Sequence, residues 1–339
     1  MTQSILFNEI QGIGEITLNR PQAYNALTHQ MVIELYQHLK KWEQDPAIHV
    51  VIIQSSHEKV FCAGGDIKAL YEKAKNHDHT VLDFFQDEYR LNSLIKHYPK
   101  PYIALLDGLT LGGGVGLSVY AHHRIATEKY IFSMPETGIG FFPDIGASYF
   151  LSRCPEASGF YLGLTGARLK AAEALTLQLV DYLVPSATLD TLKNGLFSLK
   201  THDHQAIHAY LSTFHTPSTS NTFLHSAINT CFQEKTVEGI LEKLDLQQSN
   251  WAEDTKKTLF KKCPLSLKVT LEQLTRGKQL ELDDCLTMEY TLVQHFLQNE
   301  NFYEGIRAAV IDKDNQPHWS PPSLEEINEQ QVNCFFENN

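Results

Sequence analysis

Short apolar runs alternate with longer segments of helical periodicity over the first 190 residues. Residues 50–53 and 102–106 are continuous apolar runs, which is typical of strands buried on both faces. Between them, residues 81–97 carry apolar positions at helical spacing. The alternation of strands and helices predicts the α/β class, in which helices cover a mostly parallel sheet.

The chain opens with two strand-like segments, residues 5–10 and 14–19, joined by a glycine-containing turn. Thr28 follows and is a suitable N-cap, because its side-chain oxygen can accept a hydrogen bond from a backbone N–H of the next turn. The segment after Thr28 predicts a helix with one apolar face, formed by Met31, Leu35, Leu39 and Trp42.

The pattern changes after Pro185. Residues 190–300 are helical in pattern with few strand-like runs, and helices are predicted over residues 223–232, 237–246 and 265–274. We therefore place a domain boundary near residue 190. Residues 1–190 form the predicted α/β core, and residues 191–339 form a C-terminal helical region.

Composition narrows the class of protein. Hydrophobic residues make up 42% and charged residues 20% of the chain, which is ordinary for a globular protein. No apolar run approaches the ~20 residues of a membrane span, and the first twenty residues lack the pattern of a secretory signal. We therefore expect a cytoplasmic protein without a membrane partner. The net charge of -12 argues against nucleic-acid binding.

Six cysteines stand at irregular spacing without a CxxC pair, which predicts reduced residues that mostly pack in the interior. Cys62 adjoins a glycine-rich segment, so a nucleophile is conceivable, but no activating histidine is evident and packing is favoured. The neighbouring His122 and His123 would point in different directions on a helix. No further ligand cluster stands nearby, so no metal site is predicted.

Two glycine-rich segments are candidates for ligand binding. The first contains Ala63, Gly64, Gly65 and Asp66, and the second is 112–114, ahead of a helix-like run. Glycine lets the backbone approach a ligand closely, and a helix N-terminus offers unpaired N–H donors and a positive dipole end. One donor from each segment would suit a carbonyl oxygen that becomes negative. The alternative is a pair of tight turns, and neither segment matches the dinucleotide fingerprint or the P-loop.

Two carboxylates, Glu136 and Asp144, stand in the turn-rich segment 134–146, which contains two prolines, three glycines and several apolar residues. A loop this apolar is expected to fold inward, and apolar surroundings raise the pKa of a carboxyl group. A raised pKa suits a general base near neutral pH. On spacing alone, carboxylates that cap helices or face water remain the alternative.

Several of these segments together resemble the crotonase (enoyl-CoA hydratase/isomerase) superfamily, and within it the 3-hydroxyisobutyryl-CoA hydrolase branch. The resemblance covers roughly residues 5–322 and is carried by AGGDI, GGGVGLS, RIATEK, MPETGIGFFPDIG, LTGARL, and the closing FYEGIRA, IDKD and P-x-W elements. It implies a crotonase-like ββα spiral core with a C-terminal helical subdomain that covers the active site.

The resemblance implies roles for individual residues. The backbone N–H groups of Gly65 and Gly113 would form an oxyanion hole. Glu136 would act as nucleophile or general base, and Asp144 would bind the substrate hydroxyl or assist proton transfer. Further substrate contacts are implied for Glu88, Gly64, Gly112, Asp66, Ala63, Ala23 and Arg20. For Glu88, a salt bridge on a helix surface is an equal alternative.

The family's hydratases carry a catalytic glutamate where this chain has Gly116, and a glycine where it has Asp144. The resemblance therefore implies hydrolysis of 3-hydroxyisobutyryl-CoA, and of 3-hydroxypropionyl-CoA, in valine catabolism. An enoyl-CoA hydratase or isomerase and a non-catalytic binding module remain the alternatives.

CoA would be part of the substrate, so no separate cofactor or metal is expected. Members of the superfamily are often trimers or paired trimers, so a homo-oligomer is compatible with the resemblance. Basic residues must help to bind the polyanionic CoA. The candidates include a cluster for which a solvated helix face is the favoured interpretation: Lys256, Lys257, Lys261 and Lys262.

Overall fold

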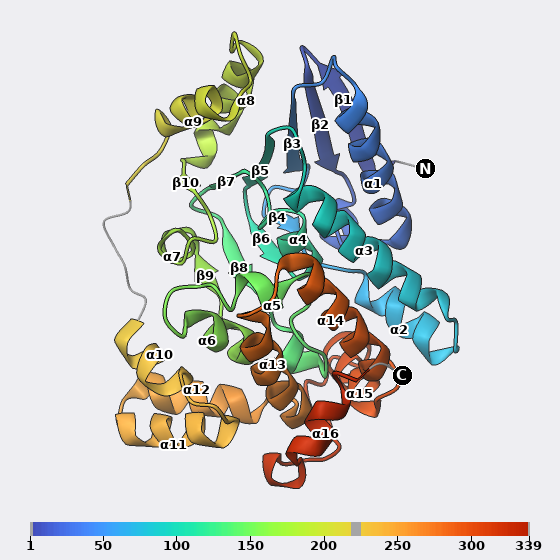
Figure 1. Ribbon diagram of the computed structural model, residues 1–339, viewed down its shortest axis with the longest axis vertical. Helices are drawn as coiled ribbons and strands as arrows, with labels where there is room; N and C mark the ends of the chain where they lie inside the picture. Colours follow the sequence, from blue (N-terminus) through green and yellow to red (C-terminus); the bar gives the residue numbers. More distant parts are fainter. Residues whose placement is uncertain (1–2, 218–224, 338–339) are drawn as a thin grey trace. The chain divides into compact units, whose positions relative to one another are not determined.

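The computed structural model describes residues 3–217 and 225–337 (Figure 1). Contacts divide the chain into two compact units that are interleaved along the sequence. Unit 1 consists of Met1–Asp66, Asp87–Phe132 and Arg168–Thr222, whereas unit 2 consists of Ile67–Gln86, Ser133–Ala167 and Phe223–Asn339.

The main sheet of unit 1 has six strands in the order β1-β2-β3-β5-β7-β10. The hairpin β1–β2 is antiparallel, and every later neighbour pairs in parallel, which confirms the predicted α/β class. The strands are β1 (Ile5–Ile10), β2 (Ile13–Leu18), β3 (Val50–Ser55), β5 (Tyr102–Leu106), β7 (His123–Ala126) and β10 (Tyr182–Leu183).

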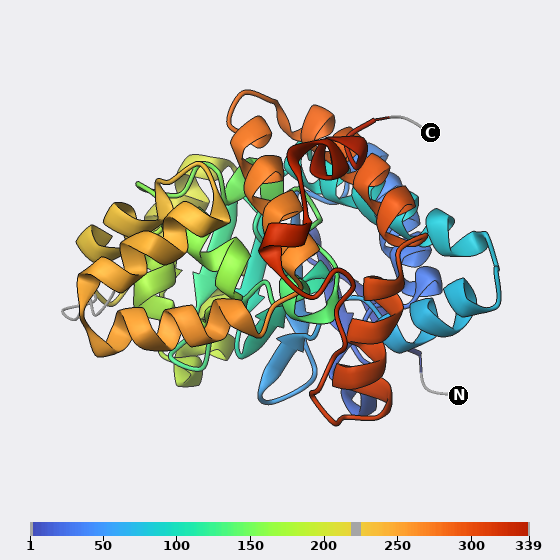
Figure 2. The ribbon, with the colours of Figure 1, turned by 90° about the horizontal axis from the view of Figure 1, so that it is seen from below.

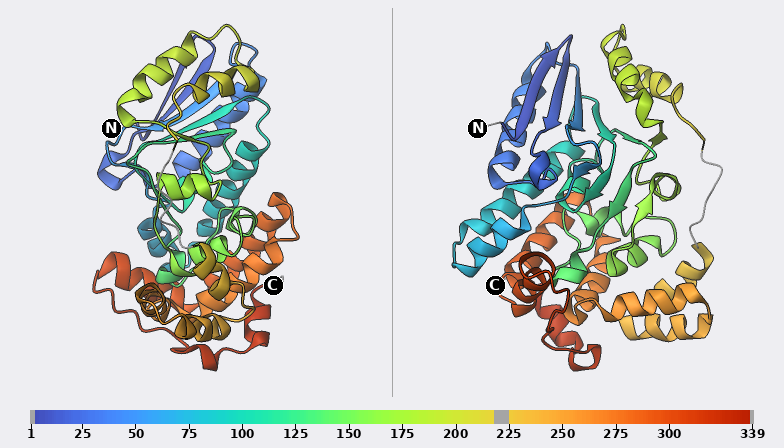
Figure 3. Two further views of the ribbon diagram at one scale, coloured as in Figure 1. Left: turned by 90° about the vertical axis from the view of Figure 1, so that its left-hand side faces the viewer. Right: turned by 180° about the vertical axis from the view of Figure 1, so that it is seen from behind.

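Helices cover the sheet of unit 1 (Figures 1 and 3). Helix α1 (His29–Gln44) begins at the predicted N-cap, where Thr28 Oγ1 accepts a hydrogen bond from Met31 N, and it buries the predicted apolar face. Helices α8 (Leu189–Phe197) and α9 (His204–Ser212) pack on the sheet as well. They bury Leu192, Leu196, Ile207 and Leu211 against strand residues that include Ile13, Val50, Ile52 and Ile103.

A second, four-stranded sheet has the order β4-β6-β8-β9. Strands β4 and β6 are parallel neighbours, so their carboxyl ends lie at the same edge. The two glycine-rich segments follow these two strands directly and are therefore brought together. The strands are β4 (Val60–Cys62), β6 (Leu109–Leu111), β8 (Ile131–Ser133) and β9 (Leu169–Lys170).

The helix predicted after the second glycine segment is only one turn long, α4 (Gly113–Gly116). Ser118 explains the early end, because its hydroxyl group hydrogen-bonds to Gly114 O and Val115 O. Such side-chain bonds compete with regular helical pairing. The other short helices of unit 1 are η1 (Pro21–Ala23), α7 (Ala171–Thr176) and η3 (Ser186–Thr188).

Unit 2 is mainly helical. Helices α10, α11 and α12 pack in succession, and α13 packs against α5, α6 and α16 (Figure 2). The helix predicted over residues 223–232 begins at His225, and residues 223–224 lie outside the described residues. The helices are α2 (Ile67–Lys75), the first turns of α3 (Thr80–Lys96), η2 (Glu136–Ile139), α5 (Ala147–Phe150), α6 (Ser158–Thr165), α10 (His225–Phe232), α11 (Val237–Gln247), α12 (Asn250–Phe260), α13 (Pro264–Gly277), α14 (Leu282–Phe296), α15 (Glu300–Ile306), η4 (Arg307–Ile311), η5 (Leu324–Glu326) and α16 (Glu329–Cys334).

The boundary predicted near residue 190 falls in α8, whose Leu192 and Leu196 belong to the core of unit 1. A division of the chain by contacts does not test whether a segment folds on its own, so the predicted boundary stays a prediction. Over residues 3–217 and 225–337, no helix has both the length and the apolar content needed to cross a bilayer.

Candidate active site

The two glycine-rich segments touch each other within unit 1. We call residues 63–66 the first glycine loop and residues 112–114 the second. A Cβ atom on Gly64 would lie 3.3 Å from Leu111 O and 3.5 Å from Gly113 N. Gly64 has φ +96° and Gly112 has φ +44°. Residues other than glycine rarely adopt a positive φ.

The N–H groups of Gly65 and Gly113 are available as donors. Among the described residues, no hydrogen-bond acceptor is found for either N–H. A Cβ on Gly113 would lie 3.4 Å from Gly65 N, so the two donors are neighbours. Because α4 is a single turn, its dipole is small, and the donors themselves supply the attraction for an anion.

Glu88 stands beside this pair of donors. It comes from α3, is only 3% exposed, and its Oε1 lies so close that a Cβ on Gly113 would collide with it. This burial does not fit a carboxylate on a helix surface. A buried carboxyl group borders the place where the two glycine loops meet.

The remaining residues implied for CoA binding surround the first glycine loop. Arg20 forms an ion pair of 2.8 Å with Asp66, and Ala63 N donates to Tyr24 O at 3.0 Å. Ala23 ends η1, directly before Tyr24. The structure thus brings together the residues that the sequence associated with this loop. Asp66 partly neutralises the positive charge of Arg20.

In unit 2, Glu136 begins η2 and is 7% exposed. Among the described residues, its Oε2 has no hydrogen-bond partner. Burial raises the pKa of Glu136 well above its ordinary value, and repulsion by Asp144 adds to this effect, whereas the positive charge of Lys262 opposes it. The predicted inward folding of this apolar segment is confirmed, and Glu136 has the properties of a base that is ready to accept a proton.

In the sequence, Lys262 stands out only as one member of the basic cluster Lys256, Lys257, Lys261 and Lys262. Its Nζ lies 3.2 Å from the position that a Cβ on Gly138 would take, and its pKa is lowered by burial while Glu136 opposes the shift. Lys256 and Lys257 instead form ion pairs on helix α12 and its neighbour α11, as predicted for a solvated helix face. Lys262 therefore contributes a positive charge near Glu136.

Asp144 is 6% exposed and lies between η2 and α5. Gln273 Nε2 donates to Pro143 O at 2.6 Å, and Gly146 N donates to Glu289 Oε2 at 2.6 Å. The chain on both sides of Asp144 is thus held by side chains from α13 and α14. Glu289 and Gln273 lie more than a hundred residues further along the chain, and no local sequence signal points to them.

The two other candidates from the sequence, Cys62 and the histidine pair at 122–123, lie in surroundings that indicate a structural role. Cys62 is fully buried, and burial raises the pKa of its thiol to about 12; the packing interpretation is confirmed. His123 begins β7 instead of lying on a helix, because it pairs with Ile103 of β5. In the described parts of the chain, no group of three or more potential ligands could hold a metal ion.

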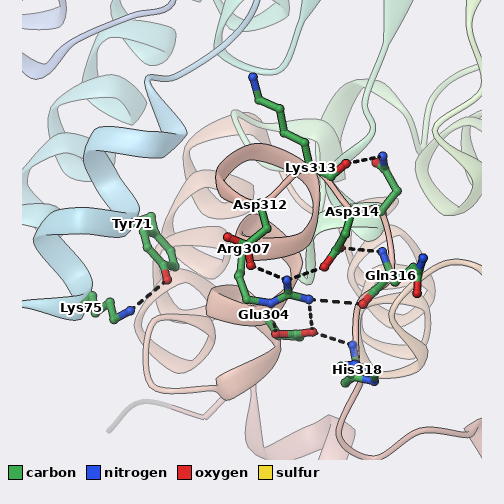
Figure 4. Close-up of polar contacts among 10 residues, drawn as sticks. Tyr71, Lys75, Glu304, Arg307, Asp312, Lys313, Asp314, Gln316 and His318 are labelled. Atoms are coloured by element: carbon green, nitrogen blue, oxygen red, sulfur yellow. Dashed lines mark hydrogen bonds and ion pairs between the residues drawn. The ribbon is translucent and has the colours of Figure 1, made fainter.

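The closing sequence elements build one loop (Figure 4). Arg307 forms ion pairs with Glu304 (2.8 Å), Asp312 (2.6 Å) and Asp314 (2.7 Å). These pairs lower the pKa values of Glu304 and Asp314. The side chain of Lys313 extends away from this cluster. Arg307 thus pairs with three carboxylates and holds the turn together, which explains why these acidic residues stand close to it in the sequence.

A family model and two relatives of similar sequence indicate the family of this chain. The family model described as enoyl-CoA hydratase/isomerase matches residues 13–336. The chain is 42% identical to the mitochondrial 3-hydroxyisobutyryl-CoA hydrolase of Gallus gallus, over 98% of this chain and 88% of that protein. The same identity and coverage are found for the mitochondrial 3-hydroxyisobutyryl-CoA hydrolase of Homo sapiens.

Solved structures with the same fold carry other names. A carnitinyl-CoA dehydratase from Mycobacterium thermoresistibile superposes with a TM-score of 0.94 at 34% identity, covering 100% of this chain and 97% of that one. An enoyl-CoA hydratase from Rhodobacter sphaeroides 2.4.1 superposes with a TM-score of 0.90 at 35% identity, covering 99% and 98%. The fold is thus shared by proteins named for different reactions.

Proposed function

The chain belongs to the enoyl-CoA hydratase/isomerase family and to its 3-hydroxyisobutyryl-CoA hydrolase branch, and we propose on this premise that it hydrolyses 3-hydroxyisobutyryl-CoA to the free 3-hydroxy acid and CoA. The observation that carries the proposal is the carboxyl pair Glu136 and Asp144. Both are buried in one apolar segment and are electrostatically coupled. The sequence departs from the hydratase pattern at Asp144 and at Gly116.

In the proposed reaction, the thioester carbonyl oxygen accepts hydrogen bonds from the N–H groups of Gly65 and Gly113. These donors stabilise the oxyanion as the carbonyl carbon becomes tetrahedral, and the loss of one such donor typically costs ~3–4 kcal/mol. The carbon–sulfur bond then breaks, and the CoA sulfur takes up a proton to leave as the thiol: the proton that Glu136 removed from water in the general-base route, or a solvent proton in the anhydride route. Glu88 lines the acyl site, and residues around the first glycine loop contact the CoA moiety: Arg20, Ala23, Ala63, Gly64, Asp66, with Gly112 from the second loop.

Glu136 has two available roles. It either attacks the carbonyl to give a mixed anhydride, which water then cleaves, or it takes a proton from the attacking water. Turnover in ¹⁸O-labelled water tests the anhydride route. Incorporation of the label into the Glu136 carboxylate, seen by mass spectrometry of the peptide that contains it, supports an anhydride that water cleaves at the Glu136 carboxyl carbon. An unlabelled carboxylate excludes only that cleavage, because water that attacks the substrate acyl carbon leaves both Glu136 oxygens in place.

Asp144 is proposed to bind the 3-hydroxyl group of the substrate or to assist proton transfer. A site built to hydrogen-bond a substrate hydroxyl strongly rejects analogues without it, because the hydrogen bond to that hydroxyl is then lost. The 3-hydroxypropionyl thioester keeps the hydroxyl and lacks only one methyl group. We therefore expect it to be accepted, with a loss of only ~1–3 kcal/mol.

An enoyl-CoA hydratase is the second candidate, favoured by the names of the two superposed structures. The test is to follow thiol release from 3-hydroxyisobutyryl-CoA and hydration of crotonyl-CoA in parallel. Fast thiol release that collapses in Glu136→Ala and in Asp144→Ala supports the hydrolase. Hydration without thiol release overturns it, and would require another group in place of the glutamate absent at Gly116.

The finer aspects of the proposal are a role in valine catabolism, independence of a separate cofactor, assembly into a homo-oligomer and a cytoplasmic location. The relatives cited above are named as mitochondrial enzymes, so cell fractionation is the necessary test of the compartment. Activity that survives dialysis against EDTA supports cofactor independence, and light scattering of the purified protein measures the oligomeric state.

A further inference from the structure

Glu289 is a fully buried carboxylate, 0% exposed, on helix α14. Its Oε2 accepts a hydrogen bond from Gly146 N at 2.6 Å. Its Oε1 accepts from Ser148 N at 2.9 Å and from Ser148 Oγ at 2.6 Å. All three of these donors belong to the short stretch that follows Asp144 in the chain.

Gln273 of helix α13 completes the arrangement on the other side of Asp144. Its Nε2 donates to Pro143 O at 2.6 Å and to Ser148 Oγ at 2.9 Å. Gln273 is also 0% exposed. Asp144 is therefore bracketed, because the carbonyl group before it and the amides after it are bound by two buried side chains from neighbouring helices of unit 2.

The backbone between these anchors is strained. Ile145 has φ +56°, and a β-branched residue rarely adopts this left-handed region. Such a conformation persists only where the surroundings over-determine it, and it is found most often at functional sites. The bracket formed by Glu289 and Gln273 provides this over-determination next to Asp144.

We propose that Glu289 and Gln273 are positioning residues that hold the Asp144 segment in the strained conformation that presents its carboxylate to the substrate hydroxyl. The inference rests on the proposed function, because it concerns the group that recognises that hydroxyl. Burial and the repulsion of Asp144 are consistent with it, since together they raise the pKa of Glu289 to about 8 against the opposing hydrogen bonds. A buried carboxylate in such surroundings is costly, and its donors all lie in one functional segment.

The test compares two substrates in the full-length enzyme. Glu289→Gln keeps the side-chain volume but turns an amide NH₂ group toward at least one of its present donors. We expect kcat/KM for 3-hydroxyisobutyryl-CoA to fall about 10²-fold, the loss that a misplacement of about 1 Å produces. Hydrolysis of isobutyryl-CoA, which lacks the hydroxyl, should change less than threefold. Gln273→Leu, which leaves the Glu289 backbone bonds in place, should shift the same ratio in the same direction.

Two further variants make the outcome decisive. In an Asp144→Asn background, Glu289→Gln should have little additional effect on the substrate ratio, because residues that act through one group are not additive. Glu15→Gln is the matched control: Glu15 is a buried carboxylate of β2 that binds Gln54 and Lys193, and its loss should leave the ratio unchanged.

The possible failures are distinguishable. A wild-type enzyme that releases no thiol overturns the proposed function. The positioning role alone is overturned if the wild type is active and the substrate ratio stays unchanged in Glu289→Gln and Gln273→Leu. This includes the case in which both variants lose activity equally toward the two substrates. If Glu289→Gln does not fold, Gln273→Leu decides the outcome.

Discussion

Two buried glutamates of unit 2, Glu136 and Glu289, differ in how their carboxylate oxygens are hydrogen-bonded. Glu289 accepts hydrogen bonds through both carboxylate oxygens, whereas Glu136 Oε2 has no partner within the described chain. The hydrogen bonds of Glu289 hold the backbone of Gly146 and Ser148. The carboxylate of Glu136 keeps lone pairs for a substrate, a water molecule or a proton, and its raised pKa makes it a stronger base.

The raised pKa of Glu136 predicts that removing its charge stabilises the protein. Between the ordinary carboxyl pKa and the raised pKa of the folded state, the native protein binds more protons than the unfolded chain, so stability falls as pH rises through this window. Glu136→Gln should therefore have a higher Tm than wild type at pH 8, by about 2–4 °C per kcal/mol recovered, and the same Tm near pH 4.5. Its thioesterase activity should fall by about 10²–10⁴.

Differential scanning calorimetry at both pH values checks this prediction. Asp83→Asn serves as a control, since Asp83 lies in the first turn of α3 and outside the buried segment 134–146. A Glu136→Gln variant that is equally stable or less stable than wild type at pH 8 would contradict the burial argument.

The second residue-level prediction concerns Gly113. In Gly113→Ala, the new Cβ would collide with Glu88 Oε1 and approach Leu27 Cδ1 to 3.2 Å, so the buried Glu88 side chain or the second glycine loop must move. We expect kcat to fall about 10²–10³-fold, as it does when one oxyanion-hole donor is lost, with a smaller change in KM. A rise in KM alone would indicate that the loop binds substrate without stabilising the transition state. Steady-state kinetics separate these results.

The residues that could be predicted are those with local signals. The glycine loops, Glu136 and Asp144 stand in short segments whose composition already indicates buried turns and close backbone approach. Gln273 and Glu289 contribute to the same segment from helices far along the chain, and an amphipathic helix pattern does not reveal which buried polar residue meets which loop. The packing of α13 and α14 on α5 brings these two residues to the segment. Lys262 reaches it from the turn between α12 and α13.

At the scale of elements, hydrophobic period predicted strands and helices well where packing on the sheet decides the structure. β5 has the predicted bounds, and α1 buries the predicted face. The exceptions are short elements governed by side-chain hydrogen bonds or strand pairing, namely α4, which ends near Ser118, and β7, which includes His123. Period alone carries no information about either effect.

The contact of α9 with the sheet contains several histidines and predicts sensitivity to acid. The ring of His204 lies 4.7 Å from that of His122 and 5.9 Å from that of His123. Burial lowers the pKa of His123 to about 4; the charge of Asp181 opposes this shift, and His204, His122 and His208 add to it. His123 is therefore neutral in the folded protein at pH values where the unfolded chain already carries the proton.

Stability should consequently decline as pH falls from about 6.5 toward 4, by up to about 1.4 kcal/mol per pH unit for one proton. Urea unfolding at pH 7, 6 and 5 measures this slope. His123→Gln should flatten the slope by about this amount. An identical slope in wild type and His123→Gln would contradict the assignment.

For the molecule as a whole, fold and reaction are separate properties. The superposed structures share nearly the entire fold with this chain but are named for dehydration and hydration, whereas the sequence relatives are named for hydrolysis. The fold class could be predicted because it follows from alternating hydrophobic patterns, but the reaction depends on a few side chains placed on that scaffold. We propose that Asp144 and the residue at position 116 carry that distinction.

The interleaved units predict that the chain does not fold in two halves divided at residue 190. A fragment 1–190 would lack Leu192, Leu196, Ile207 and Leu211, which bury one face of the main sheet. Burial of such a side chain contributes roughly 1.5–3 kcal/mol, so their combined loss is comparable to the 5–15 kcal/mol that stabilises a typical domain.

Fragments 1–190 and 1–217 form a matched pair for this prediction, because both lack the same helices of unit 2 and differ only in the segment that contains α8 and α9. Fragment 1–190 should bind more of the dye ANS and show a broader thermal transition than fragment 1–217, since its sheet exposes an apolar face. Equal dye binding and equally sharp transitions would instead support an autonomous core that ends near residue 190. The comparison thus decides whether α8 and α9 are part of the folding core or an addition to it.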